Sequence, residues 1–317
     1  MKYYLAPMEG ITGYIHRNAF HQFFTDADKY FTAFIAPNQN GKLSSREKED
    51  ILPEHNAGMQ VVPQMLTNHA EDFILTAKRL QEYGYEEVNL NLGCPSKTVV
   101  SKYRGSGFLA KPQELERFLD EIFERSEMKI SIKTRIGRDE PEEFYDLIKL
   151  YNKFPLEELI IHPRTQQDFY KNHPNLEIFK YSLEASKNPV CYNGDIFTVE
   201  DFRQFKSLFP NVETIMIGRG LLMNPGLTGM IESGKVPDKS RIKAFHDKIY
   251  TDYQEVLFGE KNVLFKMKEL WSYMIQIFTD HKKYGKKIKK AQKLAAYESA
   301  VEMLFHEQEI DKCYGGL

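Results

Sequence analysis

Cysteine is scarce in this sequence, with three residues in 317: Cys94, Cys191 and Cys313. An odd and widely spaced set argues against a disulfide framework and fits a reducing cytosol, so we expect a cytoplasmic location. Cys and His residues at metal-ligand spacing are also lacking, and we therefore expect no metal site.

Long apolar runs are lacking too, and none approaches the length of a membrane span. The amino terminus enters a strand directly and has no signal-peptide pattern, so we expect no membrane contact. The net charge of −2 excludes a uniformly basic, polyanion-binding protein, although residues 241–317 hold more basic than acidic side chains. With 42% hydrophobic and 28% charged residues, the composition is typical of a globular protein with a large core.

Short β-rich runs alternate with segments of helical periodicity through about the first 230 residues. We predict eight strands, at 3–6, 30–36, 59–64, 87–92, 129–135, 158–162, 189–193 and 214–218. We predict helices at 16–24, 68–83, 112–126, 141–153, 175–186 and 198–208. Eight alternations indicate a (β/α)₈ TIM barrel, because parallel strands need crossover helices. A doubly wound open sheet is the alternative, but it usually has fewer strands and a glycine-rich first turn, and no GxGxxG motif is present.

Beyond residue 234 the strands cease, and helical periodicity continues at 240–257, 262–279 and 287–306. We therefore predict a catalytic barrel over residues 1–235 and an appended helical bundle over 240–317. The polar segment 38–57 follows the second predicted strand, and we interpret it as a long mobile loop above the barrel mouth.

The stretch from Asn89 to Lys97, with sequence NLNLGCPSK, reads as a strand that ends in a polar turn. Alternation along the strand places Asn89 and Asn91 on one face, where buried amides are costly unless they hold something polar. Cys94 follows the strand directly, and enzymes of this architecture keep their chemistry at the carboxyl ends of the strands. From the turn alone, Cys94 could equally be a buried cysteine with no role in catalysis.

The ends of the other strands are polar as well, and their convergence on one face predicts a ligand site. The candidate residues are Pro7, Met8 and Glu9 after strand one, Gln64 on strand three, Lys133 and Arg135 on strand five, His162 and Arg164 on strand six, Asn193, Gly194 and Asp195 after strand seven, and Gly218 and Arg219 after strand eight. The last two turns suit a phosphate, because glycine lets backbone N–H groups approach an anion and arginine adds a fork. Lys133 would stabilise negative charge on a ring, and these properties together describe flavin mononucleotide (FMN).

These motifs, in this order, resemble the flavin-dependent dihydrouridine synthases that reduce uridines in transfer RNA. The resemblance covers nearly the whole chain, and the NLNLGCPSK stretch is its most specific part. It implies that Pro7, Met8, Glu9, Gln64, Lys133 and His162 lie around the flavin ring, and that Asn193, Gly194, Asp195, Gly218 and Arg219 hold its ribityl and phosphate groups. It implies that Cys94 is the proton donor, and that Asn91, Arg135 and Arg164 contact the substrate.

The resemblance implies reduction of the uracil C5–C6 bond, with hydride passing from flavin N5 to C6 and a proton from Cys94 to C5. An unperturbed thiol, with a pKa of about 8.5, is mostly protonated at neutral pH and suits this task. The target uridine must leave its stack to enter the barrel. NADPH is the expected reductant, although no motif marks its site.

Seven lysines and no acidic residue lie between His281 and Lys293. Such a run is often only a solvated helix face, but beside an RNA-modifying barrel it predicts contacts with phosphates. The expected RNA contacts are Lys282, Lys283, Lys286, Lys287 and Lys290, and the resemblance adds Lys266 and Lys268. We expect Trp271 to lie in the core.

Three alternatives remain open at this point. The same chemistry could act on ribosomal RNA, or a flavin oxidoreductase could act on a free pyrimidine, as dihydroorotate dehydrogenases do. The third alternative is a catalytically silent RNA-binding barrel. We expect a monomer with no obligate protein partner.

Overall fold

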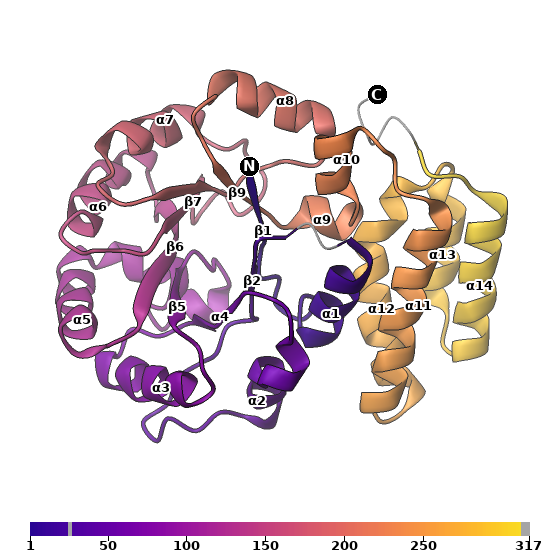
Figure 1. Ribbon diagram of the computed structural model, residues 1–317, viewed down its shortest axis with the longest axis horizontal. Helices are drawn as coiled ribbons and strands as arrows, with labels where there is room; N and C mark the ends of the chain where they lie inside the picture. The colour runs from indigo at the N-terminus through magenta and orange to yellow at the C-terminus, as the bar shows by residue number, and fades with distance from the viewer. Residues whose placement is uncertain (25–26, 312–317) are drawn as a thin grey trace. The chain divides into compact units, whose positions relative to one another are not determined.

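A computed structural model describes residues 1–24 and 27–311, so Cys313 lies outside the described residues. Its strands form one parallel sheet (Figure 1) in the order β3-β2-β1-β9-β8-β7-β6-β5-β4. The strands are β1 (Lys2–Leu5), β2 (Lys29–Phe31), β3 (Val61–Val62), β4 (Gln64–Met65), β5 (Glu87–Leu92), β6 (Lys129–Gly137), β7 (Leu159–Thr165), β8 (Val190–Tyr192) and β9 (Thr214–Ile217).

The sheet closes on itself through Pro63. The strands at its two ends, β3 and β4, are consecutive in sequence and are separated only by this residue. Proline has no backbone N–H, so the ladder is interrupted there, while the Pro63 carbonyl still accepts the Asn89 N–H at 2.9 Å. Taken as one interrupted strand, β3 and β4 correspond to the predicted strand 59–64. The eight predicted strands and the (β/α)₈ barrel are confirmed.

Helices follow the strands in the predicted alternation, and Figure 1 shows α3, α5, α6 and α7 outside the strands of this sheet. The α-helices are α1 (Tyr14–Phe24), α2 (Ser45–Ile51), α3 (Ala70–Glu82), α4 (Lys97–Val100), α5 (Pro112–Arg125), α6 (Phe144–Tyr151), α7 (Leu176–Ala185), α8 (Val199–Leu208), α9 (Arg219–Met223), α10 (Leu227–Ser233), α11 (Lys239–Val256), α12 (Glu260–Met274), α13 (His281–Lys290) and α14 (Leu294–Glu307). Short 3₁₀ segments are η1 (Pro53–Asn56), η2 (Gly105–Ala110), η3 (Pro141–Glu143) and η4 (Ile275–Ile277).

The interpretation of residues 38–57 as a long loop is wrong, because this segment contains α2 and η1. Helix α2 begins with a capping box in which the Ser44 hydroxyl accepts the Glu47 N–H and the Glu47 carboxylate accepts the Ser44 N–H. The Ser-x-x-Glu spacing that makes this box is visible in the sequence, and it could have predicted the helix.

Contacts divide the chain into two compact units. The first comprises Met1–Pro7, Asp28–Gly194 and Phe209–Met216, and the second comprises Met8–Ala27, Asp195–Leu208 and Ile217–Leu317. A cluster of buried side chains from seven positions fills the sheet interior in the first unit: Tyr4, Ala6, Phe31, Val62, Ile160, Cys191 and Met216. The domain boundary predicted at residues 235–240 remains a prediction, since the second unit also takes in two earlier segments.

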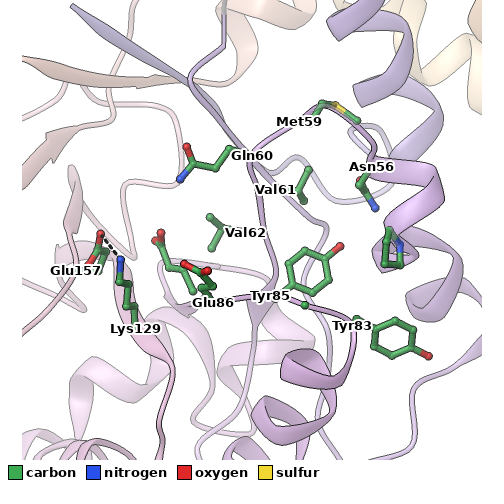
Figure 2. Close-up of a pocket in the computed structure, with 13 residues that line it drawn as sticks. Asn56, Met59, Gln60, Val61, Val62, Tyr83, Tyr85, Glu86, Lys129 and Glu157 are labelled. Carbon is green, nitrogen blue, oxygen red and sulfur yellow. Dashed lines mark ion pairs between the residues drawn. The ribbon is translucent and has the colours of Figure 1, made fainter.

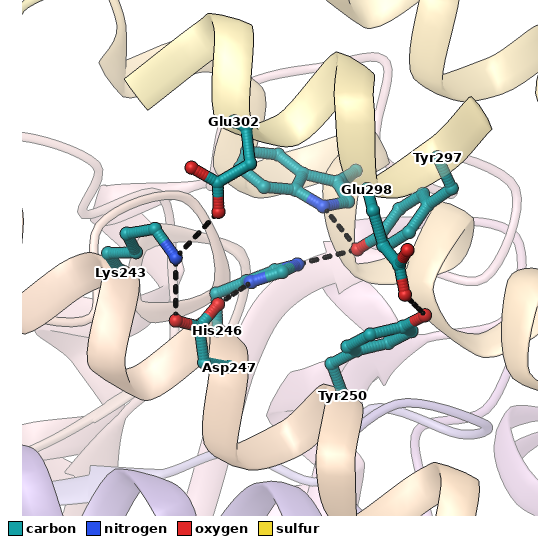
Figure 3. A network of polar contacts seen from close by, with 8 residues as sticks. Lys243, His246, Asp247, Tyr250, Tyr297, Glu298 and Glu302 are labelled. Atoms are coloured by element: carbon teal, nitrogen blue, oxygen red, sulfur yellow. Dashed lines mark hydrogen bonds and ion pairs between the residues drawn. The ribbon is translucent and has the colours of Figure 1, made fainter. Parts of the chain in front are cut away.

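The second unit contains α11 to α14, and the predicted helix 287–306 divides into α13 and α14 around Ala291–Lys293. Trp271 is 2% exposed, as expected for a core residue, and its indole N–H donates to the Tyr297 hydroxyl oxygen at 2.8 Å. His246 bonds both this hydroxyl, at 2.6 Å, and the Asp247 carboxylate, at 2.8 Å (Figure 3). Burial lowers the pKa of His246, so the neutral ring donates from Nδ1 to Asp247 and accepts at Nε2 from Tyr297.

None of the helices within residues 1–24 and 27–311 combines the length and the apolar character that a bilayer crossing needs.

Candidate active site

The turn after β5 is held by the side chain of Asn91. Its amide oxygen accepts the backbone N–H groups of Gly93, at 3.0 Å, and Cys94, at 2.9 Å. Its amide nitrogen donates to Gln64 Oε1 at 2.7 Å. Asn91 therefore fixes the backbone that carries the half-buried Cys94 side chain.

Two further residues, Arg135 and Ser106, also hold this turn. The Arg135 Nε–H donates to the Gly93 carbonyl at 2.9 Å. Ser106 donates to the Cys94 carbonyl twice, from its backbone N–H at 3.1 Å and from its hydroxyl at 2.9 Å. Gly105 has φ +56°, and a Cβ there would lie 2.7 Å from the Cys94 carbonyl oxygen. Glycine is thus needed for η2 to pack against Cys94, a role that the sequence analysis did not assign to Gly105 or Ser106.

Below Cys94, hydrogen bonds continue across the interior of the sheet. Gln64 Nε2 donates to Asn89 Oδ1 at 2.9 Å, and Asn89 Nδ2 donates to Ser131 Oγ at 3.0 Å. Ser131 donates to Glu87 at 2.7 Å, and Glu87 pairs with Lys29 at 2.7 Å. These bonds satisfy the buried amides that the sequence left unexplained, and they give Asn91 a fixed partner in Gln64.

Lys133 lies in the interior next to Asn91. The strand register pairs Lys133 with Asn91 on one side and with the core residue Ile160 on the other. Burial, reinforced by the charge of Arg135, lowers the pKa of Lys133 to about 8. No hydrogen bond or ion pair of its ammonium group is found among the described residues. Lys133 is half-buried, and a partly desolvated cation without a partner fits a ligand that carries negative charge or electron-rich edge atoms.

Arg135 and Arg164 are both about 1% exposed, and they bind the backbone of the segment after β7. Arg135 donates to the carbonyls of Thr165, at 2.7 Å, and Phe169, at 2.9 Å, and Arg164 donates to that of Asn172 at 2.6 Å. These contacts make the two arginines supports of the segment 165–172. Their predicted contact with substrate remains a prediction.

His162 receives a hydrogen bond from Arg164 Nη1 at its Nε2 atom, at 3.0 Å. Since arginine only donates, Nε2 is an acceptor and the imidazole proton lies on Nδ1. The ring of Tyr170 lies 6.0 Å from that of His162, measured between centroids.

The predicted phosphate-binding residues are held by local contacts in each unit. In the first unit, Asn193 Nδ2 donates to the Met216 carbonyl at 2.8 Å. A Cβ on Gly194 would lie 2.0 Å from the Tyr192 hydroxyl, so only glycine fits there.

In the second unit, Arg219 pairs with Asp195 at 2.6 Å and lies over the Phe197 ring. The carbonyl of Gly218 accepts the N–H groups of Leu221 and Leu222, which starts α9.

The turn at Met8 and Glu9 is closed by Thr12, whose hydroxyl accepts the Met8 N–H at 2.8 Å. Lys266, predicted to contact RNA, instead donates to the Gly10 carbonyl in this turn at 2.5 Å. Lys268 donates to the Ala291 carbonyl at 2.5 Å. Each of the two amines therefore has a partner within the second unit, and their RNA contacts remain predictions.

Helix α13 carries the lysine run. Tyr284 and Ile288 are buried and anchor the helix, while the predicted RNA contacts are all exposed: Lys282, Lys283, Lys286, Lys287 and Lys290. This arrangement gives the helix a strongly basic outer surface.

A separate cavity of about 330 Å³ opens at the amino ends of the strands (Figure 2). Its wall includes the start of β5 and β6, with Lys129 lying 4.0 Å from Glu157. None of the predicted site residues lines it. Cys94 and the other candidates follow their strands, so the candidate chemistry lies at the opposite ends.

Comparison with known proteins agrees with this geometry. The family model described as dihydrouridine synthase matches residues 4–312. The tRNA-dihydrouridine synthase B of Pasteurella multocida is 28% identical over 231 residues, covering 73% of this chain and 68% of that protein. The tRNA-dihydrouridine(16) synthase of Pseudomonas syringae pv. tomato is 29% identical over 253 residues, covering 74% and 76%.

Among solved structures, morphinone reductase matches with a TM-score of 0.51 at 13% identity, covering 76% of this chain and 88% of that one. This likeness concerns the fold alone. The match along residues 4–312 shows more: the chain belongs to the dihydrouridine synthase family and is therefore a flavin-dependent oxidoreductase.

Proposed function

We propose that the protein reduces specific uridines of transfer RNA to 5,6-dihydrouridine, using FMN and NADPH. The observation that carries the proposal is the pairing of a rigidly held Cys94 turn with the half-buried, partnerless Lys133 on the adjoining strand. The similar proteins of Pasteurella and Pseudomonas are named as transfer RNA enzymes, which supports the choice of substrate.

The residues present fit a flavin. Lys133 supplies the positive charge that a reduced ring needs, and Gln64, held by Asn89 and Asn91, presents a fixed amide beside it. The residues proposed to hold FMN are Pro7, Met8, Glu9, Gln64, Lys133 and His162 at the ring, and Asn193, Gly194, Asp195, Gly218 and Arg219 at the ribityl phosphate. When bound and reduced by NADPH, the cofactor supplies hydride to C6 of the uracil.

Cys94 delivers the proton to C5. The turn fixes its backbone through Asn91, Arg135 and Ser106, so only the thiol rotor remains to be oriented. Because the backbone of Cys94 is already fixed, little conformational entropy is lost when the thiol is positioned for proton transfer. Arg135 and Arg164 hold the segment 165–172 in place, which allows that segment to contact the uridine.

The RNA is held by the exposed lysines of α13, whose charges face no acidic residue within their own helix. The target uridine leaves its stack to reach Cys94. We propose that the protein acts as a monomer in the cytoplasm, where its substrate is found.

The decisive test maps dihydrouridine in total RNA from a strain that lacks the gene. Loss at one transfer RNA position, restored by the gene, is the expected result. Loss only from ribosomal RNA would refute the proposed substrate. A purified protein that remains colourless with added FMN would leave only the silent RNA-binding alternative, and reduction of free uracil or uridine would favour the small-molecule alternative.

A further inference from the structure

A cavity of about 670 Å³ lies at the carboxyl ends of the strands, beside the segment that carries Cys94. Its wall comes from four places in the first unit: Asn38 and Gln39 after β2, His69, Glu71 and Asp72 at the start of α3, Arg104 before η2, and Glu121 on α5. The volume falls in the range of small-molecule sites, which is about 300–1,000 Å³.

Asp72 is a buried acid in this wall. It is 9% exposed, and it has no hydrogen-bond or ion-pair partner in the part of the chain that the structure describes. Its neighbour Glu71 differs, because it is exposed and pairs with Arg125 at 2.5 Å. Neither carboxylate oxygen is fully enclosed, so the group is open to solvent and can accept hydrogen bonds from a ligand in the cavity.

Arg104 presents the opposite polarity. Its Nε–H donates to Asn68 Oδ1 at 3.2 Å, which fixes the plane of the guanidinium. Its two terminal nitrogens have no partner within residues 1–24 and 27–311. The His69 side chain is exposed at the rim, where an imidazole can stack on a flat ring.

We propose that this cavity binds an unpaired guanine of the substrate RNA, outside the uridine that is reduced. Guanine donates two N–H groups from its Watson–Crick edge, which matches the acceptor-only carboxylate of Asp72. It offers O6 and N7 as acceptors on the adjoining edge, which matches the fork of Arg104. Adenine and uracil lack this pair of adjacent donors. The inference rests on the proposed function, since it assumes an RNA substrate.

The same contacts connect the cavity to Cys94. Asn68, which accepts from Arg104, also donates to the Lys102 carbonyl at 3.2 Å. Two residues beyond Arg104, Ser106 holds the Cys94 carbonyl. A base bound by Arg104 therefore steadies the segment that positions the proton donor, so the correct neighbouring base promotes the reaction as well as binding.

The test measures the affinity of the holoenzyme for a set of synthetic substrate tRNAs in which each unpaired guanine is replaced in turn by inosine. Inosine lacks only the exocyclic amino group. We expect one replacement to weaken binding about tenfold, the loss typical of a specific base contact. Asp72→Asn should weaken binding of the parental tRNA to a similar extent and should no longer respond to that replacement. Glu82→Gln, which changes an exposed acid at the other end of the same helix and outside the cavity, should behave like the wild type.

The proposal is overturned if no inosine replacement weakens binding, or if Asp72→Asn keeps the wild-type response. It is also overturned if Asp72→Asn leaves RNA affinity intact but weakens NADPH in flavin-reduction assays, which would assign the cavity to the reductant. Dihydrouridine formed on the parental tRNA by the wild type is scored separately. If that product forms while the inosine series stays flat, only the guanine site fails.

Discussion

At the scale of the residue, Cys94 carries the proposed chemistry, and a general acid typically contributes about 10²–10⁴-fold to the rate. Cys94→Ala should therefore lower single-turnover dihydrouridine formation by about that factor. Flavin absorbance and RNA affinity should be unchanged, because the turn is held by backbone groups. Full activity of the variant would remove Cys94 as the acid.

Asn91 acts through Cys94 in this structure. Asn91→Ala leaves the N–H groups of Gly93 and Cys94 without their acceptor, and turnover should fall by about tenfold or more, since losing such a partner costs about 1–3 kcal/mol. Asn91→Asp keeps the acceptor and should recover part of the loss in kcat. Equal damage by both substitutions would instead support a direct substrate contact through the amide nitrogen.

Lys133 predicts a pH-dependent affinity for the cofactor. Its pKa is lowered to about 8 by burial, so the ammonium form is depleted as the pH rises through that value. Flavin affinity, measured by fluorescence quenching in the apoprotein, should fall between pH 7 and pH 9. Lys133→Met should bind more weakly at pH 7 and show a flat profile. A wild-type profile that stays flat would contradict the proposed contact.

At the scale of the element, α13 should contribute salt-dependent RNA affinity. Replacing Lys282, Lys286 and Lys290 together with Gln should reduce the slope of log Kd against log salt by about 2–3, at roughly 0.7–0.9 per phosphate contact. Flavin binding and the unfolding temperature should not change.

The matched control replaces three lysines that already pair with carboxylates of the first unit: Lys111, Lys149 and Lys153. Both triple variants change the net charge equally. If both reduce the slope by the same amount, general electrostatics explains the effect and α13 has no special role.

Elements were predictable wherever a local signal was complete. The strand Glu87–Leu92 has the predicted bounds, and α8 begins after Thr198 as its capping signal indicates, with Thr198 and Asp201 exchanging hydrogen bonds. The segment 38–57 was misinterpreted because its polar composition outweighed the capping signal at Ser44. In this segment the capping box at Ser44 determines the secondary structure, and the polar composition does not.

At the scale of the whole molecule, buried histidines make stability depend on pH. Burial lowers the pKa of His16 to about 3, and neither ring nitrogen has a hydrogen-bond partner within the described residues. Burial lowers the pKa of His246 as well. The unfolded chain binds protons at these sites first, so their contribution is fully present above about pH 6.5 and is lost as the pH falls below it.

His16 should reduce the unfolding free energy by about 1.4 kcal/mol per pH unit between about pH 6.5 and pH 3. Glu158 opposes this, because burial raises its pKa to about 7 and its contribution is lost as the pH rises. Urea denaturation at pH 7, 6 and 5 should therefore show the effect most clearly as a difference between wild type and His16→Phe. The phenylalanine would pack beside Phe20 and Phe245. If the unfolding free energies of the two proteins change equally with pH, the proposed contribution of His16 is contradicted.

The sequence by itself determined the barrel, because strand and helix periodicity and the order of polar strand ends are properties of neighbouring residues. It also indicated Cys94 and Lys133 as candidate site residues, since side chains that follow or line parallel strands lie toward one end of the sheet. These inferences depend on the spacing of residues along the sequence and not on contacts between residues that are distant in sequence.

Only the tertiary structure decided what each side chain touches. Asn91 holds the Cys94 turn, Arg135 and Arg164 hold the segment 165–172, Lys266 donates to Gly10, and Ser106 reaches back twelve residues to Cys94. A hydrogen bond depends on the positions of both partners to within a few tenths of an ångström, and residues far apart in sequence acquire such positions only when the chain has folded. The same reason hid Asp72, because the absence of a hydrogen-bond partner for its carboxylate in the described residues depends on the folded surroundings.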